Sequence, residues 1–123
     1  MPLLIYQISD NMVKDGNIIW SGYSFNNVPI RLTKERWEHI LKEHQEMKDK
    51  YERVLETLDN PDLIQIDDVT GGLLALRFYS LIPDSRKFVV VVYLEISNYD
   101  GFITTAYLRK QPSSNKRIIW TQE

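Results

Sequence analysis

The 123-residue chain contains no cysteine. Disulfide bonds, thiol catalysis, thiolate zinc sites and iron–sulfur clusters are therefore excluded, because each of them needs cysteine sulfur. The chain also lacks an apolar run of the about 18 residues that a membrane span requires. Its first residues lack the basic and long apolar regions of a secretory signal. We therefore expect a cytoplasmic protein that makes no contact with a membrane.

A large excess of charge of one sign is also missing, since 15 Lys and Arg residues stand against 17 Asp and Glu residues, for a formal net charge of -2. This balance disfavours a protein that coats nucleic acid non-specifically, but it allows an enzyme with a small basic cleft. Apolar residues make up 43% of the chain, which is typical of a globular protein. We expect a single domain over residues 1–123 with one core.

The spacing of apolar residues predicts two helical segments between groups of strands. Thr33 is a candidate N-cap, and Trp37, Ile40, Leu41 and His44 then recur at the spacing of one helix face. A second such run ends before the Asn-Pro pair at 60–61. Strands are expected at 3–8, 18–20, 63–66, 73–79, 88–96 and 102–108, with less regular candidates at 28–32 and 118–120. The predicted fold is α+β, with two helical segments packed on a mainly antiparallel sheet of four to five strands.

A tight turn is expected just before the strand at 102–108, where the sequence reads Asn-Tyr-Asp-Gly. A two-residue loop at 100–101 would place Thr105 opposite Ile96, in an apolar setting. A three-residue loop at 99–101 would place it opposite Glu95, in a polar setting. The sequence leaves both registers open.

The two histidines, His39 and His44, both fall on the first predicted helix. Five positions put them about 140° apart around the helix axis, so a metal ion shared between them is not expected. His44 lies on the face of Trp37 and Leu41 and should point toward the sheet, whereas His39 lies toward the polar flank. The alternative interpretation of His44 is a half-buried core histidine with no chemical role.

The strand at 102–108 and the residue after it carry a second candidate group. Alternation puts Thr105, Tyr107 and Arg109 on one face of the strand, and Phe102, Thr104, Ala106 and Leu108 on the other. A hydroxyl, a phenol and a forked guanidinium in a row suit the binding of a phosphate. The alternative is an ordinary solvent-facing polar face.

Other cations could take part in the same site. Arg77 shares a strand face with apolar neighbours, and arginine is seldom buried without a partner or a role. Arg86 and Lys87 flank the turn before the central strand, and with Arg109 they are candidate substrate-binding residues. Scattered charges of this kind are also typical of a solvated surface.

These motifs together resemble a known family. The helix at 37–44 follows Leu-Thr, a second helix ends in Leu-Asp-Asn-Pro at 58–61, and the strand motifs at 76–79 and 101–107 follow. The combination is similar to the small phage-type nucleases of the barnase, EndoU, colicin and RelE-like (BECR) superfamily. The resemblance covers about residues 31–108 and leaves residues 1–30 as an N-terminal β extension.

The resemblance implies a metal-independent ribonuclease, toxin-like or phage-linked, in which the 2′-OH of RNA attacks the adjacent phosphodiester. No cofactor or metal is expected. The family's catalytic positions fall on His39 or His44, Arg77, Thr105 and Tyr107. RNA would be the substrate, and a cognate antitoxin or immunity protein, or a second copy of the chain, would be the partner. The alternative is a module of the same fold that binds or regulates but does not catalyse.

Overall fold

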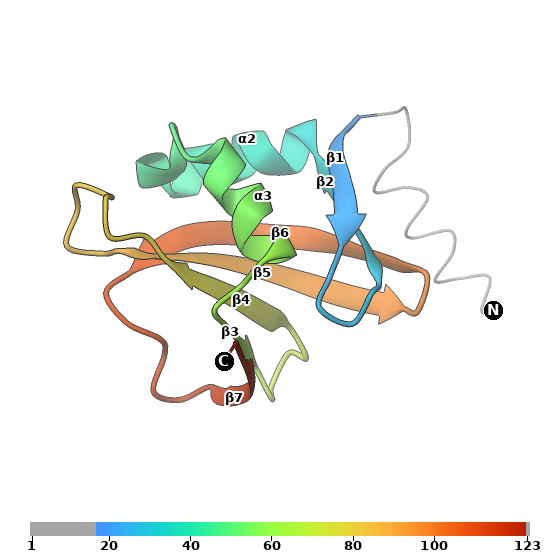
Figure 1. Ribbon diagram of the computed structural model, residues 1–123. Coiled ribbons are helices and arrows are strands. Elements are labelled where there is room, and N and C mark those ends of the chain that lie inside the picture. The colour runs from blue at the N-terminus through green and yellow to red at the C-terminus, as the bar shows by residue number, and fades with distance from the viewer. Residues whose placement is uncertain (1–16, 123) are drawn as a thin grey trace.

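The computed structural model describes residues 17–122, and the strand expected at 3–8 lies outside them (Figure 1). The elements in chain order are β1 (Ile18–Tyr23), β2 (Pro29–Thr33), α2 (Lys34–Glu43), the 3₁₀ turn η2 (Gln45–Met47), α3 (Tyr51–Asp59), β3 (Leu63–Ile66), β4 (Leu73–Phe78), β5 (Phe88–Ser97), β6 (Asp100–Arg109) and β7 (Arg117–Thr121). Among the described residues, no helix has the length and apolarity needed to cross a membrane.

One mixed sheet carries the fold, with the strand order β1-β2-β6-β5-β4-β3-β7. All neighbouring strands are antiparallel except β2 and β6, which run parallel and share only the pair Arg31 and Phe102. The α+β class is therefore confirmed, but the sheet has seven strands rather than four or five. The difference arises because the β1–β2 hairpin extends one edge and β7 extends the other.

Both helices lie on the same face of the sheet (Figure 1). Helix α2 begins where the Thr33 hydroxyl accepts a hydrogen bond from the backbone N–H of Arg36 at 3.1 Å. It ends at His44, whose N–H still donates to the carbonyl of Ile40 at 2.7 Å. Helix α3 follows η2 and ends at Asn60, because Pro61 disfavours helical geometry in the residue before it.

The core lies between these helices and the sheet. It contains Ile40 from α2, Val54 and Leu58 from α3, and Val91 and Tyr93 from β5, none of them more than 1% exposed. A smaller cluster of Leu74, Leu76 and Val90 lies on the opposite face. The long apolar run in β5 is explained by this arrangement, because its residues are covered from both faces.

The sheet curves until its two edges come close together. The ring of Phe25, in the β1–β2 turn, lies 5.1 Å from the ring of Trp120 in β7. Ser24 and Asn26 of the same turn donate hydrogen bonds to the Glu95 carboxylate at 2.5 and 3.0 Å. The β1–β2 hairpin therefore closes one end of the core.

The β5–β6 hairpin has neither of the two predicted registers. Its loop is Asn98-Tyr99, because Asp100 already pairs with Ser97 in the ladder. Thr105 therefore stands opposite Val92, an apolar setting, rather than opposite Ile96 or Glu95. The Asp-Gly pair belongs to the strand, so the predicted turn was placed too far along the chain.

A bulge in β6 also corrects the predicted alternation. The ladder skips Thr104, because Val92 pairs with Thr105 and Tyr93 pairs with Ile103. Ile103 consequently joins Ala106 and Leu108 in the core below the helices. Thr105 and Tyr107 are left on the opposite face.

Removal of the Tyr93 hydroxyl is expected to stabilise the fold. Tyr93 is completely buried, and among the described residues its hydroxyl has no hydrogen-bond partner, while burial raises its pKa. Because an unpaired buried hydroxyl is destabilising, Tyr93→Phe should raise the free energy of unfolding by about 1 kcal/mol in urea denaturation. A loss of stability on this change would mean that the hydroxyl makes a hydrogen bond in solution.

Candidate functional site

The predicted site residues His44 and Tyr107 lie in contact. Strand β2 leaves β6 after a single pair, and η2 packs beside β6 farther along. This places His44, the C-cap of α2, against Tyr107 of β6, with ring centroids 5.4 Å apart and an interplanar angle of 35°. Tyr107 packs with the cluster on the face opposite the helices, so the contact joins the end of α2 to that face.

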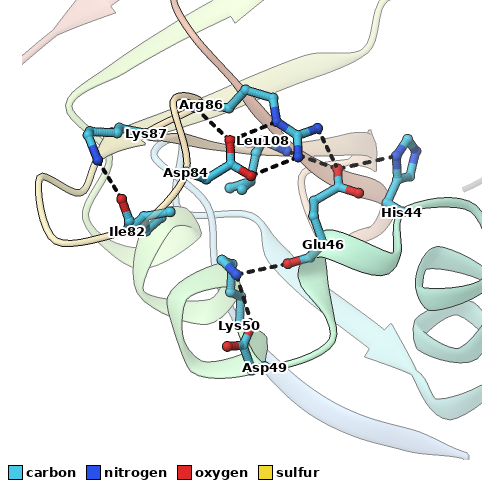
Figure 2. Close-up of polar contacts among 9 residues, drawn as sticks. All are labelled: His44, Glu46, Asp49, Lys50, Ile82, Asp84, Arg86, Lys87 and Leu108. Carbon is cyan, nitrogen blue, oxygen red and sulfur yellow. Dashed lines mark hydrogen bonds and ion pairs between the residues drawn. The ribbon is translucent and has the colours of Figure 1, made fainter.

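A carboxylate that the sequence analysis did not single out faces this histidine (Figure 2). One oxygen of Glu46, Oε2, lies 3.7 Å from Nδ1 of His44 and 3.8 Å from Nη1 of Arg86, and it accepts the backbone N–H of Leu108 at 3.5 Å. The Glu46 side chain is 20% exposed and that of His44 is 32% exposed. With Nδ1 turned to the carboxylate, Nε2 is the imidazole nitrogen that faces away from it.

Arg86 is fixed between two carboxylates (Figure 2). Its Nε and Nη2 atoms donate to Asp84 at 3.0 and 2.9 Å, while its third nitrogen faces Glu46. The hydrogen bonds from Arg86 hold the pKa of Asp84 well below its usual range, and those to Asp84 raise the pKa of Arg86. The neighbouring Lys87 donates to the carbonyl of Ile82, which ties it to its own loop.

The phenol of Tyr107 has a second polar neighbour on its own strand. Burial raises the pKa of Tyr107, and the positive charge of Arg109 lowers it to a smaller extent. The net shift is upward, so the phenol is protonated at neutral pH and able to donate a hydrogen bond. Arg109 is exposed and donates from Nε to the carbonyl of Gln111 at 2.9 Å. The hydroxyl of Thr105 is buried on this face and has no hydrogen-bond partner in the described part of the chain.

Two other predicted residues lie elsewhere. Arg77 donates to the carbonyl of Asn60 at 2.8 Å and has Nε 3.9 Å from Glu56, so it ties β4 to the end of α3. His39 lies one turn before the end of α2, half exposed, with Nε2 3.3 Å from the Glu43 carboxylate. The structure therefore gathers His44, Tyr107, Arg86 and Arg109, but not Arg77 or His39, around β6 and η2.

Glu46 and Asp84 are the polar residues of this site that the sequence analysis missed. Glu46 stands two positions after His44, in a turn that interrupts the helical pattern. This short spacing was the signal in the sequence that the Glu46 carboxylate could lie beside the His44 imidazole. Asp84 stands two positions before Arg86, in the Pro-Asp-Ser turn, and an aspartate in a turn commonly accepts the backbone N–H two residues on, as Asp84 does from Arg86.

Neither a metal centre in the described residues nor a similar protein indicates the function of this site. Within residues 17–122, no group of three or more His, Cys, Asp or Glu side chains is arranged to hold a metal ion. Comparisons of the chain with protein-family models, curated proteins and solved structures found no match. The resemblance to the BECR nucleases therefore stays a prediction.

Proposed function

We propose that the protein is a metal-independent ribonuclease whose active site is built around His44 and Tyr107. The observation that carries the proposal is the contact of a part-exposed imidazole with a protonated phenol, while the Glu46 carboxylate faces the other side of the imidazole. An imidazole changes its charge near neutral pH, and a carboxylate beside one nitrogen orients the ring for proton transfer at the other.

The proposed reaction uses the His44 imidazole as proton acceptor and the Tyr107 phenol as hydrogen-bond donor. The 2′-oxygen of one nucleotide attacks the adjacent phosphorus, and its proton passes to Nε2 of His44. The bond from phosphorus to the 5′-oxygen breaks, that oxygen takes a proton from solvent water, and His44 then returns its proton to the solvent. The products are a 2′,3′-cyclic phosphate and a free 5′-hydroxyl. In this proposal the Tyr107 phenol donates a hydrogen bond to the phosphate, where negative charge develops.

Arg109 is the cation that this proposal assigns to the phosphate. Its charge acts on the Tyr107 phenol, it is exposed, and none of the described carboxylates forms an ion pair with it. Arg86 has a different role here, since it is bound to Asp84 and faces Glu46, and it helps to fix the carboxylate that orients His44. Arg77 and His39 are left out of the catalytic group.

One observation favours a second candidate, a binding or regulatory module that does not catalyse. Arg86 shares the Glu46 carboxylate with His44, but its guanidinium is already hydrogen-bonded to Asp84 and faces Glu46. It is therefore less available to bind a phosphate. The formal net charge of -2 agrees with a partner other than bulk nucleic acid. Under either candidate, a cytoplasmic location and a cognate antitoxin, an immunity protein or a second copy of the chain remain the predicted context.

Cleavage of single-stranded RNA in the presence of EDTA is the test of this proposal. We expect cleavage that leaves 2′,3′-cyclic phosphate ends and no cleavage of DNA of the same sequence, because DNA lacks the nucleophilic 2′-hydroxyl. The ends are identified by mass spectrometry of the fragments. Activity that is lost in EDTA and restored by magnesium would contradict the mechanism. A folded protein that cleaves none of a broad set of RNAs would favour the binding module.

A further inference from the structure

A cleft of about 320 Å³ opens at the other end of α2. It lies beside the single point at which β2 pairs with β6, where Arg31 stands opposite Phe102. The residues that matter here are Arg31 of β2, Arg36 and His39 of α2, and Phe102 of β6, all of which line it. Its size lies at the lower end of the range for small-molecule sites, which is about 300–1,000 Å³.

The lining is basic in a chain that is acidic overall. Two guanidinium groups meet a single lining carboxylate, that of Glu35, while the His39 imidazole in the same lining faces Glu43. Arg31 is only 9% exposed and forms an ion pair with Asp100. The Arg36 guanidinium has no carboxylate within ion-pair distance among the described residues, although the chain holds more acidic than basic groups. An anion is therefore the ligand whose charge this cleft complements.

An aromatic ring completes the wall. The Arg31 guanidinium lies over the ring of Phe102, 6.0 Å from its centroid, and Phe102 remains partly exposed. A phenyl face with a cation beside it is the arrangement on which nucleic-acid bases stack in single-strand binding proteins. An acidic peptide would use the cations but would leave the aromatic wall unused.

We propose that this cleft binds one nucleotide of single-stranded RNA, with its base against Phe102 and its phosphate at Arg36. The proposal rests on the proposed function for its choice of ligand, and it makes the cleft a positioning site separate from the reacting groups. Arg36 precedes His44 by eight residues, which is about 12 Å of rise along α2. A strand that follows the helix would thus be held by the cleft while a neighbouring phosphodiester lies at His44.

Binding of an RNA oligonucleotide with every 2′-hydroxyl methylated tests the cleft without cleavage, because the nucleophile is blocked. Fluorescence anisotropy should show that Arg36→Glu weakens binding by about ten- to a hundredfold, as expected for the loss of a charged hydrogen bond. Lys34→Glu is the matched control, since Lys34 lies in the same helix turn, is exposed and does not line the cleft. We expect less than about a threefold change for it, because a single exposed charge contributes little to a specific contact. Phe102→Leu should weaken binding while leaving the charge unchanged.

Equal weakening by Arg36→Glu and Lys34→Glu would overturn the proposal, since it would show general electrostatic attraction. An unchanged affinity of the Arg36 variant, or displacement of the oligonucleotide by an equal concentration of an acidic peptide, would overturn it as well. Failure of the proposed function has a different result. A protein that binds the methylated oligonucleotide through Arg36 but never cleaves unmodified RNA supports the cleft and rejects the ribonuclease.

Discussion

His44→Ala is expected to lower the rate of RNA cleavage by about 10²- to 10⁴-fold, which is the usual effect of losing one acid–base group. The physical reason is the placement of the imidazole, with one nitrogen toward Glu46 and the other free to move a proton at the substrate. The change removes no backbone hydrogen bond, because His44 contributes to the end of α2 through its N–H. Initial rates on a fluorogenic RNA, compared at equal concentrations of folded protein, measure the effect.

His39→Ala is the matched control for this change. It removes an imidazole from the same helix, but His39 is half exposed and pairs with Glu43 at a distance from Tyr107. Because His39 lines the cleft proposed to hold RNA, we expect this change to affect KM at most and to leave kcat close to that of the wild type. If both variants lose activity equally, or if His44→Ala retains it, the assignment of His44 as the proton-transfer group is wrong. Thermal denaturation of each variant separates loss of chemistry from loss of fold.

The sequence predicted one half of the candidate site because that half depends on local spacing. His44 follows Trp37 and Leu41 at helical intervals, and this alone directs it to the sheet. The other half depends on segments far apart in the chain. Glu46 meets Arg86 across 40 positions, and that pairing depends on where the Pro-Asp-Ser turn lies against η2. Arg77 could not be placed either, because its bond to the carbonyl of Asn60 is set by the packing of α3 on β4.

In the fold, too, the features set by short segments could be predicted from the sequence, and those set by long-range packing could not. The start of α2 at Thr33 and the long apolar strand β5 were predicted, because an N-cap and a continuous apolar run are properties of short segments. The register of the β5–β6 hairpin was not, because it depends on how closely β6 approaches its neighbours. An Asp-Gly pair usually marks a turn with positive φ, yet here Gly101 lies in the strand, and the described residues with positive φ are Asn27 and Gly71.

Gly101→Ala is expected to destabilise the protein by about 1–3 kcal/mol, the usual cost of overpacking a filled core. A Cβ atom at Gly101 would lie 2.6 Å from Cδ1 of Ile30 and still closer to the carbonyl oxygen of Leu94. Ile30 is completely buried, so its side chain has no space into which to move. The absence of a side chain at Gly101 therefore allows β6 to lie close to β2 and β5. Urea denaturation followed by circular dichroism measures the loss.

Gly72→Ala is the control, since its nearest neighbour would be the Thr70 hydroxyl oxygen at 3.3 Å, at the end of a side chain that can rotate. We expect a change of less than about 1 kcal/mol there, because the lower entropy of the unfolded chain with alanine offsets a close contact of this size. A larger loss at Gly72 than at Gly101 would mean that Gly101 does not meet the Leu94 carbonyl. The register with the loop at Asn98-Tyr99 would then be wrong. Because Thr105 and Tyr107 follow Gly101 on the same strand, that result would also move the phenol away from His44.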